Sequence, residues 1–453
     1  MKRKIVTLLM ALTMVLSMVG CAGKDEAPTA TEETSTSAVE ESNDAETAEE
    51  TLFEGRTITV AFLNVETADA IQAQIDAFCA KYGCTIDVEI ITGDSDENAN
   101  TMFMRAATGN LPDIFRLPTG MATIGNLDPA TNLVDLSEYD FMDNITDAYK
   151  DIASDSEGHI YSIPIEASNV AGVFYNKTVF NELGLTVPTT WAEFMDTCKW
   201  IRDNTDMDPV SSPFENAAGK QILHLAQYYY VLKEDAEFNE KYVSQEINLH
   251  DSAAYVRGPE KLYEIYQNDL QNDDPLSTTL EDSARAICDG TAAFVISRSK
   301  FMTSVEAVAP DKINDIGFFP LPDESEEDLG VAVWLPCSWY MSQTASDKEL
   351  ALKFLEFLTT QEAINAYCEI VSPVGAFMLN NVTTPDNVSA AVMEAQEWAA
   401  KSSSPVMEYF IDFKGRNLPD ILAMCGTGEL EPSEAIAMIE EDYKLNAEQN
   451  GIW

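Results

Sequence analysis

The chain has 453 residues, and its 77 acidic and 27 basic side chains give it a formal net charge of −50 at pH 7. This charge excludes a protein that binds nucleic acid by neutralising phosphates, so no nucleic-acid partner is expected. It also disfavours strongly anionic ligands and favours neutral molecules or small cations, although solubility on an exposed surface accounts for most of the acidity.

The first 21 residues have the pattern of a bacterial export signal. Three basic residues at positions 2–4 precede an apolar run, 5–18, that is too short to span a bilayer. The next residues, 18–21, resemble a bacterial lipobox, although Met18 stands where leucine is preferred. We therefore expect a lipoprotein signal peptide at 1–21, lipidation of Cys21 and a location on the extracellular face of the cell membrane. An ordinary signal peptide with an incidental cysteine is the alternative.

Residues 22–54 consist mainly of Ser, Thr, Ala and Glu. Such a composition offers almost nothing to bury, so this segment is predicted to be a disordered acidic tether. The remaining chain of about 400 residues is longer than one hydrophobic core usually spans, which favours two lobes.

Strand and helix patterns alternate after the tether. Ile58, Val60 and Phe62 have the two-residue period of a strand, and a helical stripe follows up to Gly83. Further strands are predicted at 86–90 and 113–117, with a helix ending at Gly109 between them. This alternation predicts an α/β protein with a parallel, doubly wound sheet. Later in the chain, three capping-box patterns predict helix starts, at 190–193, 346–349 and 359–362.

The stretch Glu157–Phe194 carries the most specific pattern in the chain. It resembles the signature of family 1 extracellular solute-binding proteins, the oligosaccharide-binding group that includes maltose-binding protein. The matching positions are Tyr161, Pro164, Tyr175, Asn176, Lys177, Phe180, Leu183–Leu185, Pro188, Thr190, Trp191, Glu193 and Phe194.

Other phrases extend this resemblance over nearly all of residues 56–453, among them Gly109–Asp113, Gly290–Phe294 and Ser372–Gly375. The family implies a two-lobe, type II periplasmic-binding-protein-like fold, in which each lobe is a mostly parallel sheet flanked by helices and hinge strands join the lobes. On this basis lobe 1 is expected to comprise 55–166 and 326–372. Lobe 2 is expected to comprise 167–325 and the C-terminal helices in 373–453.

Ligands of parallel sheets bind beyond the carboxyl ends of the strands. This rule points to Asn64 and Glu66 after the first strand, to Arg116 in the third, and to Glu166 just beyond Pro164. In the family, the acidic position matched by Glu166 can contact the ligand. The competing explanation for each of these residues is that it is a solvated polar side chain at the end of a loop.

Sugars present flat apolar faces edged with hydroxyls, so their sites need aromatic rings beside planar polar groups. The resemblance places candidates of this kind where the chain returns to the cleft and in the second lobe: Arg298, Phe301, Trp334, Trp339, Tyr409 and Phe410. Core packing is the competing explanation for each aromatic residue. The tyrosines at 228–230 are assigned to packing.

Enzyme, metal and redox motifs are missing from the sequence. It has no Gly-x-Ser-x-Gly, no His-Glu-x-x-His and no glycine-rich phosphate loop, and its three histidines are not spaced as metal ligands. A partial calcium-loop pattern at 94–98 lacks the required glycine and the closing glutamate. No cofactor or metal is expected. Eight cysteines include no CxxC pair, and a bond between Cys79 and Cys84 stays open.

Together these observations predict a lipid-anchored, monomeric substrate-binding protein that is not an enzyme. It would capture a carbohydrate, expected to be a neutral oligosaccharide, between its lobes and deliver it to the permease of an ABC importer. A polyamine or other small cation is the alternative ligand. An extracellular carbohydrate-active enzyme is the alternative function, because the abundant carboxylates permit one.

Overall fold

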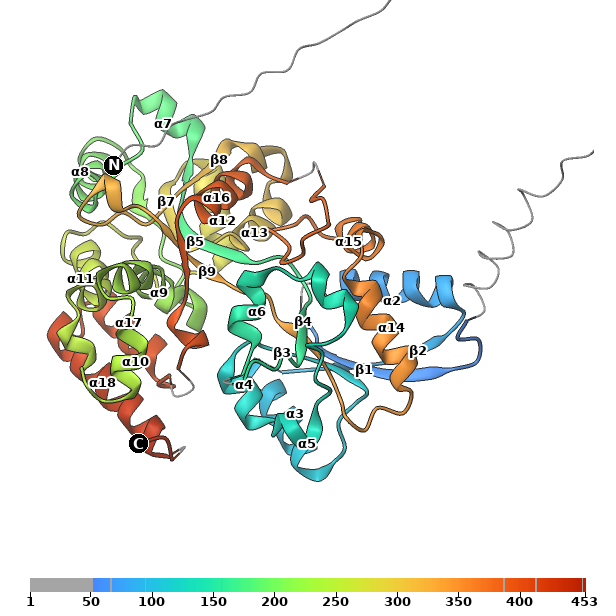
Figure 1. Cartoon of the computed structure of the whole chain (residues 1–453). Helices are drawn as coiled ribbons and strands as arrows, with labels where there is room; N and C mark the ends of the chain where they lie inside the picture. Colours follow the sequence, from blue (N-terminus) through green and yellow to red (C-terminus); the bar gives the residue numbers. More distant parts are fainter. Residues whose placement is uncertain are drawn as a thin grey trace, which may run out of the picture. The chain divides into compact units, whose positions relative to one another are not determined.

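The computed structural model (Figure 1) describes residues 52–453, apart from 66, 94, 156, 386–387, 412–413 and 450. The predicted signal peptide, Cys21 and nearly all of the predicted tether lie outside the described residues. Residues 49–453 form one compact unit with two separate β-sheets, which define two lobes. None of the described helices is both long enough and apolar enough to cross a membrane.

The described part of lobe 1 contains a five-stranded sheet with the order β2-β1-β3-β10-β4. Helices cover both of its faces: in β1, Ile58, Val60 and Phe62 pack in one core cluster with α2 and α14, whereas Ala61 packs in another with α3. The strands are β1 (Thr57–Leu63), β2 (Thr85–Ile91), β3 (Ile114–Leu117), β4 (Ser162–Pro164) and β10 (Ser338–Met341). The helices are α2 (Ala68–Tyr82), α3 (Ser95–Thr108), α4 (Met121–Asn126), α5 (Pro129–Asn132), η1 (Asp140–Asn144), α6 (Asp147–Ala153), α14 (Lys348–Leu358) and α15 (Gln361–Cys368).

The described part of lobe 2 contains a six-stranded sheet with the order β11-β9-β5-β7-β6, in which β8 also pairs with β5. Its two faces are also both covered, since Val173 and Phe174 of β5 belong to different core clusters. The strands are β5 (Asn169–Asn176), β6 (Asp208–Val210), β7 (Ala292–Arg298), β8 (Ile316–Phe319), β9 (Val331–Trp334) and β11 (Ser403–Pro405). The helices are α7 (Lys177–Leu183), α8 (Trp191–Asn204), α9 (Ala217–Glu234), α10 (Phe238–Val243), η2 (Leu249–Asp251), α11 (Ala253–Gln267), α12 (Leu280–Asp289), α13 (Phe301–Val308), η3 (Pro310–Asp315), η4 (Glu326–Asp328), α16 (Ala390–Lys401), η5 (Met407–Tyr409), α17 (Leu418–Gly426) and α18 (Pro432–Gln449).

The predicted two-lobe α/β architecture is therefore confirmed. In each sheet, one strand runs antiparallel to its neighbours. In lobe 2, β5 is antiparallel to β7, β8 and β9, and in lobe 1, β10 is antiparallel to β3 and β4. Each of these two strands is the first that the chain forms after crossing from the other lobe. The remaining strands of each sheet run in one direction, as the doubly wound pattern predicts.

Three chain segments connect the lobes, and they hydrogen-bond to one another. The backbone N–H of Ile165 in the first crossing donates to the carbonyl of Cys337 in the second, at 3.1 Å. The N–H of Ser168 donates to the carbonyl of Ala376 in the third, at 2.9 Å. Gly375 permits this contact, because a Cβ there would lie 1.9 Å from the Ser168 carbonyl oxygen. These hydrogen bonds define the hinge, and Gly375 belongs to the motif that the sequence pointed out.

The structure moves three of the predicted domain boundaries. Strand β9 pairs with β5, so residues 331–334 belong to lobe 2 and the return to lobe 1 begins after Trp334 rather than at 326. Phe377 and Leu379 pack in the lobe 1 core, so the last crossing is completed after them rather than at 373. At the other end, Phe53 is only 2% exposed and packs edge-on against Tyr82, so the predicted tether cannot extend to residue 54.

Two of the three predicted capping boxes are displaced by one residue. Thr190 caps α8 as predicted, by accepting a hydrogen bond from the backbone of Glu193. Helix α14 is capped by Asp347 instead of Ser346, because the Ser346 hydroxyl and backbone N–H both donate to Asp113. Helix α15 is capped by Thr360 rather than by its neighbour Thr359. Side-chain contacts thus decide between adjacent residues that are equally able to cap.

The seven cysteines of the described residues are all free thiols. Cys79 and Cys84 lie close, with their sulfur atoms 3.8 Å apart, and Cys84 donates a hydrogen bond that lowers the pKa of Cys79. The two residues that could pair according to the sequence are therefore adjacent but not bonded in this structure.

Candidate functional site

A cleft with a cavity volume of about 490 Å³ lies between the two lobes. This volume is within the range of about 300–1,000 Å³ that is typical of small-molecule sites. Lobe 1 contributes residues of β3 and α4 and the segment after β4, and lobe 2 contributes residues of α9, β7, β9 and η5. Because both lobes supply the walls, a molecule in the cleft contacts both at once.

The cleft lies where strands end, as the sequence rule predicts. Arg116 is near the end of β3, and Glu166 follows β4 by two residues. Arg298 is the last residue of β7, and Trp334 is the last residue of β9. All four line the cleft, so the strand ends bring together side chains that lie far apart in the sequence.

Arg116 and Glu166 form an ion pair in the lobe 1 wall. The Nη2 of Arg116 donates to Oε1 of Glu166 at 3.1 Å, and Arg116 is only 7% exposed. Burial disfavours the charged guanidinium, but neighbouring groups, Glu166 among them, outweigh this effect and raise the pKa of Arg116. The Nε of Arg116 is enclosed and has no hydrogen-bond partner among the described residues. Arg116 thus keeps unused donor capacity beside the cavity.

Aromatic rings and a second arginine form the lobe 2 wall. The guanidinium of Arg298 lies over the Trp334 ring, 5.5 Å from its centroid. Tyr409 donates its hydroxyl to the carbonyl of Leu335 at 3.2 Å, and its burial raises its pKa. The flat ring of Trp334 and the planar guanidinium of Arg298 are the combination that a sugar face with its hydroxyls requires.

Further polar groups complete the lining. Lys414 donates to Glu408 at 2.7 Å, and the Asn169 side chain accepts from the backbone N–H of Lys300 at 3.0 Å. Gln221 on α9 also lines the cavity. These groups offer both donors and acceptors. In the described part of the chain, no three His, Cys, Asp or Glu side chains are grouped as a metal ion would need.

Five of the ten predicted ligand-binding residues line this cleft: Arg116, Glu166, Arg298, Trp334 and Tyr409. Phe301 and Trp339 are fully buried and are core residues instead. Phe301 packs against Phe174 with 5.2 Å between ring centroids, and Trp339 packs edge-on against Phe62. For these two, the competing explanation of core packing is the correct one.

Of the other three predicted residues, two are not among the described lining residues and one cannot be placed. Asn64 is exposed after β1, and Phe410 is 39% exposed next to Tyr409, but neither is among the lining residues. Glu66 lies outside the described residues. The tyrosines at 228–230 are buried in the lobe 2 core, as predicted.

Sequence reasoning missed several lining residues. Gln221 and Leu225 on α9 are four residues apart and therefore share one face of the helix, but that face reads as core in the sequence. Lys300 follows Arg298, the last residue of β7, by two residues, so the rule that ligands bind at strand ends could have predicted it. Glu408 and Lys414 carry no sequence signal, because the chain reaches the cleft there through an irregular segment.

Residues 73–394 match the family model described as "Bacterial extracellular solute-binding protein". The chain belongs to this family. The expected relationship is thus confirmed, and the family consists of binding proteins.

The multiple sugar-binding protein of Streptococcus mutans serotype c is 24% identical over 275 residues, which cover 59% of this chain and 63% of that protein. The match therefore spans less than two thirds of that relative. Among solved structures, RafE in complex with raffinose has a TM-score of 0.71 at 17% identity, with 86% of this chain and 99% of that chain covered. A Bacillus licheniformis sugar transporter in complex with stachyose has a TM-score of 0.65 at 18% identity, with 86% and 100% covered. These similarities support the two-lobe fold.

Proposed function

We propose that this protein captures a carbohydrate in the cleft between its lobes and delivers it to the permease of an ABC importer. The observation that carries this proposal is the pairing of the Trp334 ring with the Arg298 guanidinium at the junction of the lobes. Trp334 offers a flat apolar surface for a sugar ring, and the arginines, Gln221 and Glu166 offer hydrogen bonds to its hydroxyls. The sugar ligands named for the relatives agree with the proposal that this protein binds a carbohydrate.

Capture by closure follows from the position of the cleft. A ligand that contacts both walls stabilises the closed arrangement more than the open one, and the hydrogen-bonded crossings at 165–168 and 335–337 act as the hinge. The closed molecule then presents both lobes to the permease. In this proposal the protein is a monomer and a binding protein rather than an enzyme. The two carboxylates among the described lining residues, Glu166 and Glu408, are engaged by cations, which fits a binding role.

A thermal-shift screen over neutral and charged sugars and polyamines tests the ligand class, because a bound ligand raises the unfolding midpoint by mass action. We expect a carbohydrate to raise it, and titration calorimetry to give one site per chain. A shift with spermidine alone would favour the alternative of a cation receptor. Product formation from an oligosaccharide over hours would favour an enzyme.

The lipid anchor is tested independently of the ligand. We expect mass spectrometry of the protein from membranes to find lipid on Cys21, and Cys21→Ala to move the protein to the medium or leave it as a precursor. A wild-type protein that carries no lipid contradicts the anchor but leaves the proposed binding function in place.

A further inference from the structure

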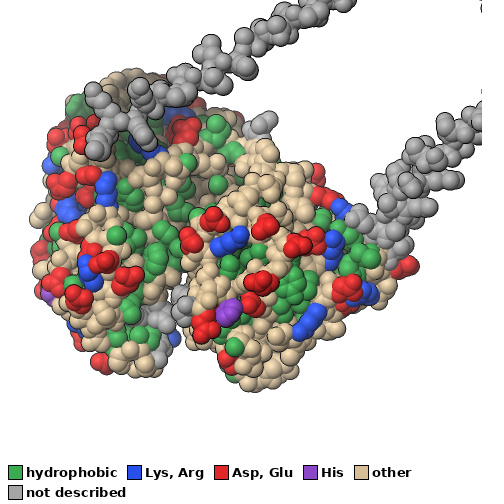
Figure 2. Space-filling model, in the orientation of Figure 1, with side chains coloured by type: hydrophobic (Ala, Val, Ile, Leu, Met, Phe, Trp, Pro, Cys, Tyr) green, Lys and Arg blue, Asp and Glu red, His purple; other side chains and the backbone are tan. Residues whose placement is uncertain are grey.

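The charge of the cleft is opposite to that of the whole chain. The chain has 77 acidic and 27 basic residues, and Figure 2 shows acidic side chains spread over the visible face with fewer basic ones among them. Of the described residues that line the cleft, four are basic (Arg116, Arg298, Lys300 and Lys414) and two are acidic (Glu166 and Glu408). Acidic side chains outnumber basic ones in the whole chain, whereas basic ones outnumber acidic ones among the described residues of the cleft lining.

Both cleft carboxylates are already engaged. Glu166 lies 3.1 Å from the Arg116 guanidinium, and Glu408 lies 2.7 Å from the Lys414 ammonium. Neither carboxylate is therefore an unengaged partner for a cationic ligand. This argues against a polyamine.

Two arginines on opposite walls have donors to spare. Arg116 on the lobe 1 wall uses one hydrogen bond, to Glu166, out of five N–H donors. Arg298 on the lobe 2 wall lies over Trp334, and no carboxylate of the described residues is paired with it. A guanidinium offers two parallel N–H groups that match the two oxygens of a carboxylate. Arg298 is half-buried and has no counter-charge among the described residues, so a ligand that carries a carboxylate would supply one.

We propose that the carbohydrate bound by this cleft is acidic, carrying at least one uronate carboxylate, and that Arg298 is the residue that neutralises it. This inference rests on the proposed function and gives its substrate class. The net charge of −50 does not prevent such binding. Charges more than about 10 Å apart are largely screened at 0.1 M salt, whereas the arginines contact the ligand directly.

The test compares sugars that differ only in charge. Short oligouronates of galacturonate, of mannuronate and of glucuronate-substituted xylose are each paired with the same sugar after its carboxyls have been reduced to hydroxymethyl groups. We expect at least one uronate to raise the unfolding midpoint, and its reduced partner to bind at least tenfold more weakly. Raising sodium chloride from 50 to 500 mM should weaken binding of the uronate but not of the reduced sugar.

The variant Arg298→Gln assigns the effect to one residue. It should weaken binding of that uronate at least tenfold and binding of the reduced sugar clearly less, because the reduced sugar loses only a hydrogen-bond donor whereas the uronate also loses its counter-charge. Arg285→Gln is the matched control, since Arg285 is an exposed arginine of lobe 2 outside the cleft lining, and it should leave both affinities unchanged. Because the reduced sugars are tested on the wild-type protein, the result does not depend on whether a variant folds.

Each outcome separates the two proposals. If a reduced sugar binds as tightly as its uronate, or only neutral sugars bind, the acidic ligand is wrong and the sugar-binding function stands. If Arg298→Gln weakens both members of a pair equally, Arg298 acts as a hydrogen-bond donor and the assigned role is wrong. If neither uronates nor neutral sugars bind, both proposals fall.

Discussion

Two buried cations, Arg116 in the cleft wall and Lys261 in the lobe 2 core, differ in how fully their donors are used. Lys261 is completely buried, and its ammonium contacts Oε1 of Gln227 at 2.7 Å, the carbonyl of Pro322 at 2.6 Å and Oδ1 of Asp323 at 3.0 Å. Three acceptors for three donors leave nothing for a ligand. Arg116 makes one hydrogen bond and borders a cavity. Burial alone therefore does not mark a functional cation, whereas unused donors beside a cavity do.

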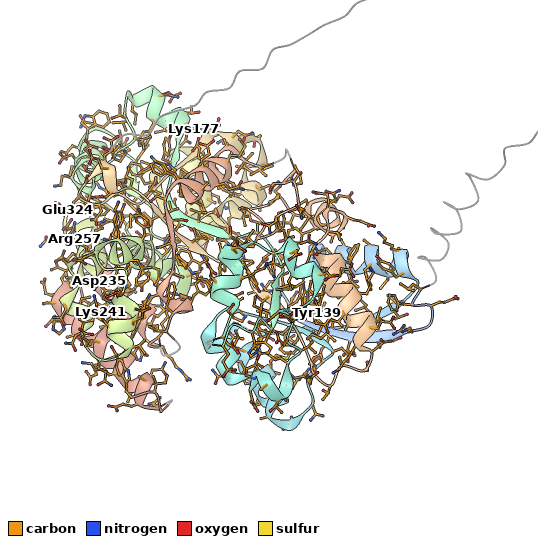
Figure 3. The ribbon with its side chains drawn as sticks, in the orientation of Figure 1. Tyr139, Lys177, Asp235, Lys241, Arg257 and Glu324 are labelled. Atoms are coloured by element: carbon orange, nitrogen blue, oxygen red, sulfur yellow. The ribbon has the colours of Figure 1, made fainter. Side chains whose placement is uncertain are left out.

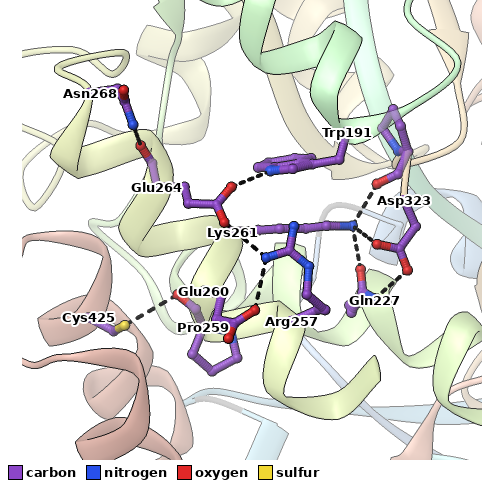
Figure 4. Close-up of polar contacts among 11 residues, drawn as sticks. Trp191, Gln227, Arg257, Pro259, Glu260, Lys261, Glu264, Asn268, Asp323 and Cys425 are labelled. Carbon is purple, nitrogen blue, oxygen red and sulfur yellow. Dashed lines mark hydrogen bonds and ion pairs between the residues drawn. The ribbon is translucent and has the colours of Figure 1, made fainter. Parts of the chain in front are cut away.

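Figure 4 shows how Lys261 ties lobe 2 together. Its ammonium lies over the ring of Trp191, 4.9 Å from the centroid. The indole of Trp191 donates to Glu264, which also accepts from Arg257 at 2.9 Å. The network thus joins α8, α9 and α11 to the segment that contains Asp323.

The largest expected effect comes from breaking this saturated cluster. Lys261→Met leaves Asp323 buried without its cation, so we expect a loss of about 3–5 kcal/mol in the free energy of unfolding. Ligand affinity, measured where the variant is folded, should stay at the wild-type value, because Lys261 does not line the cleft. Denaturant unfolding and calorimetry measure the two quantities separately.

Lys241→Met is the matched control. Lys241 pairs with Asp235 at 2.7 Å on the surface of lobe 2, where both residues are labelled in Figure 3. Because water screens this pair, the change should have little effect on stability. A loss equal to that of Lys261→Met would show that the difference between buried and exposed pairs is not the cause.

A third buried basic group, His224, extends the comparison because no acidic side chain among the described residues pairs with it. Burial, with a smaller effect of the Lys414 charge, lowers its pKa to about 3, so the ring is neutral in the folded protein. The unfolded chain takes up this proton near pH 6.5, so the wild type loses stability as the pH falls from 6.5 towards 3. The loss amounts to at most about 1.4 kcal/mol per pH unit.

His224→Gln removes this proton-binding group and should be less sensitive to acid. The difference in unfolding free energy between wild type and variant should be constant above pH 7 and shift in favour of the variant below pH 6. Denaturant unfolding at pH 7.5, 6, 5 and 4.5 measures it. A difference that is the same at all four pH values would mean that His224 takes up a proton in the fold as readily as in the unfolded chain.

The next smaller effect concerns Arg116. Arg116→Lys keeps the charge beside Glu166 but loses the parallel donors, so carbohydrate affinity should fall about tenfold, or roughly 1.4 kcal/mol, with little change in the ligand-free unfolding midpoint. An unchanged affinity would show that Arg116, like Lys261, serves only the fold.

The smallest expected effect is that of removing most of the predicted tether. Deleting residues 22–51, which the sequence predicts to bury nothing, should leave both the unfolding midpoint and the affinity unchanged. Extending the deletion through residue 54 removes Phe53 from the lobe 1 core and should lower the midpoint by several degrees. Equal unfolding midpoints for the two deletions would show that Phe53 does not stabilise the lobe 1 core.

Local patterns in the sequence predicted the architecture because hydrophobic periodicity and helix-ending residues determine where strands and helices form. The alternation of Ile58, Val60 and Phe62 places a strand, and the left-handed backbone at Gly83 ends α2 where a glycine was expected to stop the helix. The motif at 157–194 identified the family. The rule that ligands bind at strand ends located Arg116 and Glu166 in the cleft, and the family resemblance located Arg298 there. Each of these signals involves residues close together in the chain.

The tertiary structure alone decided which aromatic rings face the cleft and what charge the cleft has. Trp334 and Trp339 are five residues apart, but β9 joins the sheet of lobe 2 and β10 joins that of lobe 1, so one ring lines the cavity and the other lies in the core. The positive charge of the cleft arises from residues between 116 and 414, which no window of sequence contains. The composition of the whole chain reports the average surface, whereas a binding site depends on the few side chains that folding brings together.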